Sequence, residues 1–181
     1  LFTAEGMLMG IRHRMPMPAC VYQSYLDWYK TQQRYAKGGA FAKESELLKV
    51  AGLYLWEAPG NTCLSALGSG KIGLMDEPIN HSKGCGGVMR TAPCGMLKMP
   101  DVPDNEDAYA LQGAMAGAIT HSHVMGYVPA AMLADIVHMI LLEDGRTLEN
   151  IVLDSLERME RMFDYPATKN FAELIHRAIA L

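Results

Sequence analysis

The sequence predicts a single all-α domain, and three observations support this fold class. Apolar residues recur at helical spacing along most of the 181 residues. No segment shows the strict alternation of apolar and polar residues that is typical of a half-buried strand. No linker or internal repeat divides the chain, and its length suits one domain, residues 1–181, with a sizeable core.

Five helices are expected before residue 143 from the spacing of apolar residues. Their ranges are Thr3–Arg12, Val21–Gln33, Ser45–Leu55, Asn105–His121 and Tyr127–Leu142. We expect Asp104 to cap the helix over 105–121 and Asp107 to lie in its first turn. The stretch "LQGAMAGAIT" in that helix is rich in Gly and Ala, so it should pack closely against another helix.

Two amphipathic helices are expected at the end of the chain. The first starts at Leu148, with Thr147 as N-cap after Gly145 has ended the preceding helix. Its exposed face carries two acid–base pairs spaced four residues apart, Asp154 with Arg158 and Glu157 with Arg161.

Pro166 separates this helix from the last one, whose apolar face includes Phe171, Leu174 and Ile175. That helix runs to Leu181 without a stop signal, and the chain does not begin with Met. We therefore expect a domain that is truncated at both ends.

Composition excludes several classes of protein. The formal net charge of −4 gives no basic field that would attract nucleic acid or an anionic membrane. No uninterrupted apolar run is long enough to cross a bilayer, so no membrane partner is expected. The four cysteines form no C-x-x-C pair, which predicts reduced thiols in a cytoplasmic protein rather than a zinc finger.

The run "NHSKGCGGVMR", from Asn80 to Arg90, is the least ordinary segment. Glycines at 84, 86 and 87 could expose successive backbone N–H groups, with a helix starting near Val88. Such a loop at a helix N-terminus can bind phosphate, and Ser82 and Lys83 could add polar contacts. The run matches no established phosphate-loop pattern, so an ordinary structural loop is an alternative.

A second candidate is "THSHVMGY", from Thr120 to Tyr127, where one expected helix ends and the next begins. His121 and His123 are two residues apart and do not share a helix face, unlike metal-binding histidines four apart. His121 could contact a ligand, or it could simply interact with the helix macrodipole.

Other polar and aromatic clusters have simpler structural explanations. In "APGNTCLSAL", Asn61 or Thr62 can cap the helix that follows the Pro-Gly turn. Near-helical spacing of the aromatic residues at 22, 25, 28 and 29 favours core packing over stacking on bases. Asp135 and His138 lie in an apolar helix, where burial would require polar partners.

Taken together and in order, "PGNTCLSAL", "NHSKGCGGVMRTAP" and "ITHSHVMGY" resemble the ADP-ribosylglycohydrolase family, which includes the dinitrogenase-reductase-activating glycohydrolase. The resemblance spans nearly the whole chain. Its most specific element is G-x-x-M-R-x-A-P, from Gly86 to Pro93, followed by the T-H motif about thirty residues later.

The resemblance implies an all-α hydrolase that removes ADP-ribose from a modified side chain or small molecule with two magnesium ions. The binding residues that it implies are Ser82, Gly84, Cys85, Gly86, Gly87, Met89, His121, Gly126 and Tyr127. The loop over 82–87 would wrap the diphosphate and the adjacent ribose, and Arg90 would have a structural role.

Family members carry two acidic metal-binding motifs, T-D-D-[ST] before the segment similar to "LFTAEG" and D-x-D-[DST] beyond the final helices. Neither occurs in this sequence, and the acidic doublets Asp76-Glu77 and Glu143-Asp144 match neither motif. No catalytic residue and no metal ligand is therefore expected in this chain, and little or no turnover by the chain alone.

Three hypotheses remain. The chain could be part of an ADP-ribosylglycohydrolase whose metal motifs lie outside residues 1–181. It could be a pseudoenzyme that binds ADP-ribose without catalysis, or a structural protein that reuses the fold, as crystallins related to this family do. The cleaved linkage and the oligomeric state stay open.

Overall fold

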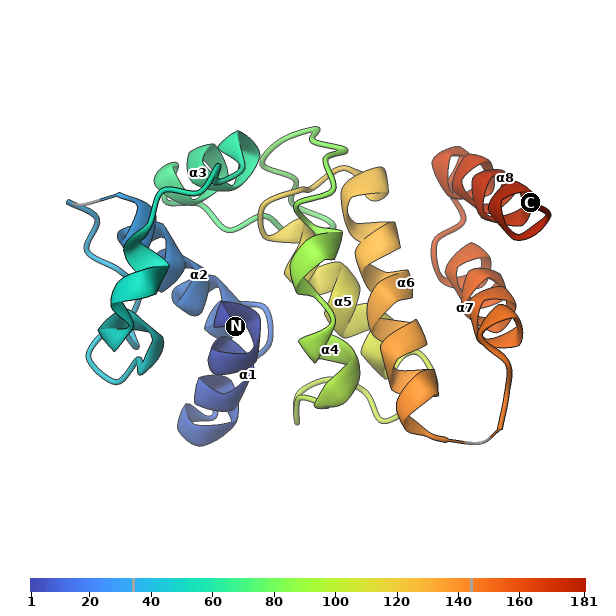
Figure 1. The fold of residues 1–181 in the computed structure, drawn as a ribbon, viewed down its shortest axis with the longest axis horizontal. Helices are drawn as coiled ribbons and strands as arrows, with labels where there is room; N and C mark the ends of the chain where they lie inside the picture. Colours follow the sequence, from blue (N-terminus) through green and yellow to red (C-terminus); the bar gives the residue numbers. More distant parts are fainter. Residues whose placement is uncertain (34, 144) are drawn as a thin grey trace.

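The computed structural model describes residues 1–33, 35–143 and 145–181. Within these ranges the regular structure is entirely helical, which confirms the predicted fold class. Figure 1 shows three groups of helices side by side: the N-terminal elements, a central group and a C-terminal pair.

The N-terminal group contains α1 (Phe2–His13), α2 (Ala19–Gln32), the 3₁₀ helices η1 (Leu47–Lys49) and η2 (Ala51–Tyr54), and α3 (Asn61–Gly68). The central group contains η3 (Val88–Arg90), α4 (Pro93–Met96), α5 (Ala108–Ala118) and α6 (Val124–Leu141). The C-terminal pair is α7 (Leu148–Met162) and α8 (Pro166–Ile179).

The close pairing of α5 with α6 forms the middle of the molecule (Figure 1). Small residues allow it: a Cβ built on Gly113 would lie 2.5 Å from the carbonyl oxygen of Ala130. A Cβ on Gly117 would lie 2.9 Å from the Cβ of Ala130. The prediction that the Gly/Ala-rich helix packs closely against a neighbour is confirmed, because any larger side chain here would push the two helices apart.

Helix α6 is the apolar core helix of the central group. By length and composition it is the one helix among the described residues that could cross a membrane, with a mean hydropathy of 1.7 over 18 residues. Asp135 and His138 interrupt its apolar sequence, so no uninterrupted apolar run of that length occurs in it. Half of this window is buried against other helices, as in any core helix, so composition alone does not make it a membrane span.

The segment over 45–55 forms two 3₁₀ helices instead of the predicted α-helix Ser45–Leu55. Val50 between them is extended, with φ −89° and ψ 104°. The Glu5 carboxylate accepts hydrogen bonds from the Ser45 hydroxyl (2.8 Å) and the Leu47 N–H (3.3 Å). The Glu5 side chain, which is distant in sequence, thus binds polar groups that would have local partners in a continuous α-helix.

The predicted helix Asn105–His121 is shorter than expected, and Asp104 does not cap it. Helix α5 begins at Ala108, and Asp107 occupies the N-cap position without a side-chain capping bond. The Asp107 carboxylate instead accepts hydrogen bonds from the guanidinium groups of Arg158 and Arg161. These ion pairs lower the pKa of Asp107, with the Arg161 hydrogen bond as the main cause.

Thr147 caps α7 as predicted, since its hydroxyl accepts a hydrogen bond from the N–H of Asn150 at 3.2 Å. The two acid–base pairs spaced four residues apart form different ion pairs from those expected. Asp154 binds Arg146 at 2.9 Å, and the Arg158 Nε donates to the buried carboxylate of Asp135 at 3.1 Å. The acidic residue Asp144 lies outside the described residues.

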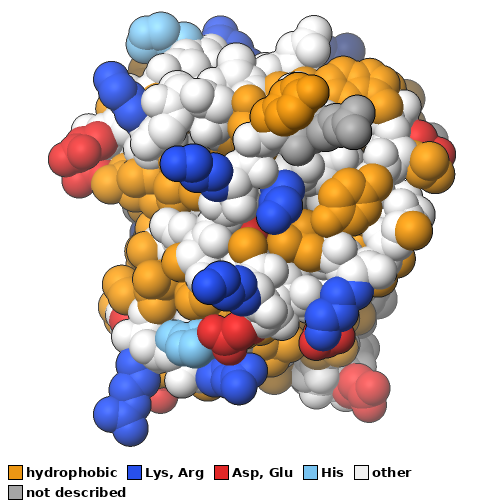
Figure 2. Space-filling view, turned by 90° about the vertical axis from the view of Figure 1, so that its left-hand side faces the viewer, with side chains coloured by type: hydrophobic (Ala, Val, Ile, Leu, Met, Phe, Trp, Pro, Cys, Tyr) orange, Lys and Arg blue, Asp and Glu red, His pale blue; other side chains and the backbone are white. Residues whose placement is uncertain are grey.

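One end of the molecule, formed by the N-terminal elements, exposes several hydrophobic side chains. Figure 2 shows hydrophobic and basic side chains interspersed on this face. Among the exposed residues are Val50, Tyr54, Leu55 and Trp56 of the 3₁₀ region. Hydrophobic and basic side chains of the described residues are therefore mixed on this face.

Candidate functional site

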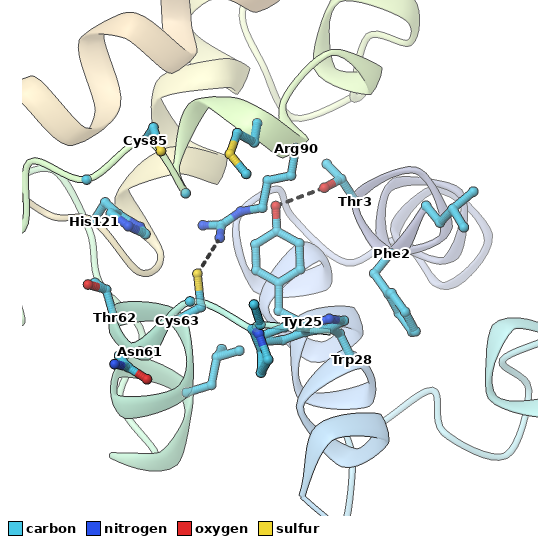
Figure 3. Close-up of a pocket in the computed structure, with 18 residues that line it drawn as sticks. Phe2, Thr3, Tyr25, Trp28, Asn61, Thr62, Cys63, Cys85, Arg90 and His121 are labelled. Atoms are coloured by element: carbon cyan, nitrogen blue, oxygen red, sulfur yellow. Dashed lines mark hydrogen bonds between the residues drawn. The ribbon is translucent and has the colours of Figure 1, made fainter. Parts of the chain in front are cut away.

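A cavity of about 570 Å³ opens between the N-terminal helices and the central group. This volume lies in the range of small-molecule sites. One wall consists of the glycine-rich loop, Arg90 and His121, and the other of α1, α2 and the start of α3. Figure 3 shows residues of these elements around the same space, with Arg90, Cys63 and Tyr25 near its centre.

Asn80 ties the glycine-rich loop to the turn that carries His121. Its amide Nδ2 donates to the carbonyl oxygen of Thr120 at 2.9 Å, and its Oδ1 accepts from the N–H of Ser82 at 3.0 Å. The same Oδ1 also accepts from the N–H of Ser122 at 3.3 Å. One side chain therefore sets the position of two segments that are forty residues apart in the sequence.

The glycine-rich loop beside the cavity contains backbone N–H groups that no other group of the described chain accepts. The N–H of Gly84 donates to the Ser82 hydroxyl at 3.3 Å. Within the described part of the chain, the N–H groups of Cys85, Gly86 and Gly87 have no hydrogen-bond acceptor. Consecutive free N–H groups are typical of anion-binding concavities, so the predicted anion-binding role of the loop stays a prediction. The expected α-helix after Gly87 is a short 3₁₀ helix, η3.

Two glycines of the site serve close packing rather than the cavity wall. A Cβ on Gly87 would lie 2.5 Å from the carbonyl oxygen of Gly126. A Cβ on Gly126 would lie 2.7 Å from the carbonyl oxygens of both His121 and Ser82. Both positions therefore need glycine so that the loop can rest on the N-terminus of α6.

His121 is 2% exposed and follows the last turn of α5. Its Nδ1 is 2.8 Å from the hydroxyl oxygen of Thr120, and its ring lies against Gly84 and Gly86. Burial lowers the pKa of His121 from 6.5 to about 4, and the nearby Arg90 charge contributes to the same shift. The imidazole is therefore neutral at pH 7. His123 has a different role, since its Nδ1 caps α6 by accepting from the N–H of Met125.

Arg90 holds the base of the cavity together. Its guanidinium donates to the Cys63 sulfur (3.3 Å), the carbonyl oxygen of Ala116 (3.2 Å) and the Thr120 hydroxyl (2.5 Å). The guanidinium carbon lies 4.4 Å from the centre of the Tyr25 ring, as a cation–π contact. These contacts agree with the expected structural role of Arg90.

The opposite wall was not predicted as part of a site. It includes Phe2, Thr3, Tyr25 and Trp28 from α1 and α2 (Figure 3). Tyr25 is buried in the core as predicted, yet its hydroxyl bonds to that of Thr3 at 2.9 Å beside the cavity. No local pattern reports this wall, because helical spacing looks the same for a residue that lines a cavity and one that fills the core.

The start of α3 also contributes to this wall through Asn61, Thr62 and Cys63. The predicted capping role of Asn61 or Thr62 is wrong, because Gly60 is the N-cap and makes no side-chain capping bond. The Thr62 hydroxyl is instead 3.3 Å from that of Ser82, across the mouth of the glycine-rich loop.

The structure brings most of the predicted binding residues together. Those that line the cavity are Gly84, Cys85, Gly86, Met89 and His121. Ser82, Gly87 and Gly126 do not line the cavity and instead pack against one another where the loop meets α6. Tyr127 is 4% exposed and packs in the second core cluster, with its ring centroid 5.9 Å from that of Phe163, away from the cavity.

The residues of the cavity do not fit a magnesium site. Its described lining includes no Asp or Glu side chain. Elsewhere in the described ranges, no three His, Cys, Asp or Glu side chains come close enough to hold a metal ion. Magnesium requires oxygen ligands such as carboxylates, so the described lining cannot hold the ion by itself.

The family model described as ADP-ribosylglycohydrolase matches residues 1–181, the whole chain. Searches of curated proteins and of solved structures found no match.

Proposed function

Because the chain belongs to the ADP-ribosylglycohydrolase family, we propose that its cavity binds the ADP-ribosyl group of a modified protein side chain or small molecule. The family is one of hydrolases, and the bond to be cleaved would be the glycosidic bond of the bound ADP-ribosyl group. The chain by itself should show little or no turnover, since its cavity supplies no carboxylate from the described residues.

The arrangement of the glycine-rich loop carries this proposal. The N–H groups of Cys85, Gly86 and Gly87 have no acceptor in the described chain and lie in a loop beside the cavity. A diphosphate offers several oxygen acceptors on adjacent phosphorus atoms, which suits such a row of donors. The binding residues of the proposal are therefore the loop over 82–87, Met89 and His121.

The aromatic wall supports a ligand with a ring in addition to phosphate. Trp28 and Tyr25 line the cavity opposite the loop, with Phe2 beside them (Figure 3). Aromatic side chains give large contact areas to planar groups. A nucleotide-sugar combines an anionic part and a planar base, and the cavity combines donors on one wall with aromatic rings on the other.

Magnesium stays a prediction from the family resemblance. When bound, the ions would stabilise negative charge and activate water. The residues of this chain bind and orient the nucleotide part of the substrate in our proposal, and the metal ligands would come from outside residues 1–181.

Calorimetric titration of the chain with ADP-ribose tests the proposal, with AMP and ribose 5-phosphate as controls. We expect ADP-ribose to bind at least about tenfold more tightly than either control, which corresponds to about 1.4 kcal/mol. The full diphosphate should engage more loop donors than a monophosphate can. A folded chain that gives no binding signal with ADP-ribose would refute the proposal and favour a purely structural protein.

A second candidate function is ADP-ribose binding without catalysis. The absence of Asp and Glu from the described cavity lining favours it. An assay of ADP-ribose release from a modified substrate, run on the longest natural form of the protein, separates the two functions. Binding with release supports the hydrolase, and binding without release supports the non-catalytic module.

A further inference from the structure

Arg90, Thr120 and His121 form a hydrogen-bonded series that ends at the cavity. An arginine guanidinium can only donate hydrogen bonds. The Arg90 NH2 group lies 2.5 Å from the Thr120 Oγ1, so the threonine oxygen is the acceptor of this bond. The Thr120 side chain is fully buried, and its own hydroxyl proton therefore needs an acceptor within the protein.

The best acceptor for that proton is the His121 Nδ1, at 2.8 Å from the Thr120 Oγ1. The Cys63 sulfur also neighbours the hydroxyl, but at 4.0 Å it is a weak acceptor at a long distance. A Thr120 hydroxyl that donates to Nδ1 leaves this nitrogen without a proton. A neutral imidazole then carries its single proton on Nε2.

The neutral state of the ring is consistent with its surroundings. His121 is buried next to the permanent charge of Arg90, and both effects disfavour the imidazolium form. The Nε2 atom has no hydrogen-bond partner in the described ranges and faces the glycine-rich loop. A Cβ on Gly84 would lie 3.3 Å from Nε2, and one on Gly86 would lie 3.0 Å from it.

We infer that Arg90 and Thr120 are positioning residues that hold His121 in the Nε2–H tautomer, so that the ring donates a hydrogen bond into the cavity. The nature of the ligand rests on the proposed function, but the tautomer does not. His121 then acts with the loop N–H groups as one further donor, which selects ligand groups that can only accept, such as diphosphate oxygens. In this state it cannot take up a proton at Nε2 as a general base.

Nitrogen NMR of the ¹⁵N-histidine-labelled full chain at pH 7 tests the inference directly. The His121→Gln variant identifies the His121 signals among those of the six histidines. We expect a pyrrole-type Nε2 and a pyridine-type Nδ1 for His121 in the natural sequence. A protonated Nδ1, or a charged ring, would overturn the inference. This measurement does not depend on whether a Thr120 variant folds.

Two variants of Thr120 separate positioning from mere packing. Thr120→Val has nearly the same shape but no hydroxyl, so the Nε2–H preference should be lost and ADP-ribose should bind about tenfold more weakly. Thr120→Ser keeps the hydroxyl and should therefore keep the natural Nε2–H tautomer of His121. An unchanged tautomer in a folded Thr120→Val variant would remove Thr120 from this role.

Failure of the tautomer assignment and failure of the proposed function give different results. If the Nε2–H tautomer is observed but ADP-ribose does not bind, the proposed function fails and the tautomer assignment stands. If ADP-ribose binds but the Nδ1 is protonated, the tautomer assignment fails and the proposed function stands.

Discussion

Gly86 and His121 are in such close contact that a Cβ on Gly86 would lie 2.9 Å from the Cε1 and 3.0 Å from the Nε2 of His121. We predict that Gly86→Val abolishes measurable ADP-ribose binding, which means that the affinity falls by at least about tenfold. The branched side chain would displace the ring and fill the space next to the loop N–H groups. Calorimetric titration measures the change.

Gly52→Val is the matched control for this variant. No atom lies within 4 Å of a Cβ on Gly52, and the residue is exposed in η2, far along the chain from the loop. Its affinity for ADP-ribose should stay within about twofold of the natural value. Equal affinities of Gly86→Val and Gly52→Val would show that the loop is not part of the binding site.

Arg90→Lys should destabilise the protein although it keeps the charge. A lysine ammonium cannot reach the Cys63 sulfur, the Ala116 carbonyl and the Thr120 hydroxyl in the planar geometry that the guanidinium uses. We expect a loss of about 1–3 kcal/mol in the free energy of unfolding, because buried polar groups would lose their partners. Urea denaturation measures it, and an unchanged midpoint would contradict the structural role of Arg90.

The buried His121 should make the protein less stable in acid. Its pKa falls from 6.5 to about 4 in the folded state, so between these values the unfolded chain binds a proton that the folded chain does not. Its contribution to stability is therefore present above pH 6.5 and is lost progressively as the pH falls toward 4.

Urea denaturation at about pH 7 and about pH 4.5 checks this expectation by comparing the natural sequence with His121→Gln. The variant should lose less stability on acidification, while His123 and His138, whose pKa values are also lowered by burial, titrate in both proteins. Parallel losses in the two proteins would refute the assignment to His121.

Removal of the partner of the buried Asp135 should be costly. The Asp135 side chain is 1% exposed and accepts a hydrogen bond from Arg158 at 3.1 Å. Burial raises its pKa even with this arginine present. We expect Arg158→Met to lower the free energy of unfolding by about 3 kcal/mol, because it leaves a buried carboxylate without its charged partner.

Arg161→Met is the control, since the Arg161 side chain is 52% exposed and pairs with acids nearer the surface. Its loss should be about 1 kcal/mol or less. Thermal or urea denaturation of both variants tests the difference. A larger loss for Arg161→Met than for Arg158→Met would show that burial of Asp135 does not set the energetics of this network.

Magnesium should have little effect on ADP-ribose binding by this chain. Because the described cavity lining contains no carboxylate, the metal could be held only by the ligand itself. We expect the affinities in magnesium and in EDTA to agree within about threefold. Affinity that rises tenfold or more with magnesium would reveal a metal site formed by this chain.

The helical class and the position of the glycine-rich loop at the cavity were predictable from local signals. Helical periodicity is strong where one face packs on a core, as in the helix that Thr147 caps. The glycine-rich run from Ser82 to Gly87 is also informative by itself, because such clusters occur where the backbone approaches another group closely. The structure places His121 directly against this run.

The resemblance of the three ordered motifs identified the family, which the match over residues 1–181 confirms. The remaining predicted helices differ from the structure mainly at their ends. Asp107 is an example: its position next to Ala108 is typical of a cap, but two arginines from α7 bind its carboxylate.

Contacts between residues far apart in the sequence determined the remaining features of the fold and of the candidate site. The amino-acid sequence by itself identified an all-α hydrolase family and predicted an anion-binding loop, since those signals lie within short segments. Only the tertiary structure revealed the aromatic wall around Trp28, the replacement of the helix at 45–55 and the series from Arg90 to His121. Tyr25 contacts Thr3, 22 residues away, Ser45 contacts Glu5, 40 residues away, and Arg90 contacts Thr120, 30 residues away. Local propensity cannot report the chemistry of a group that only folding brings into contact.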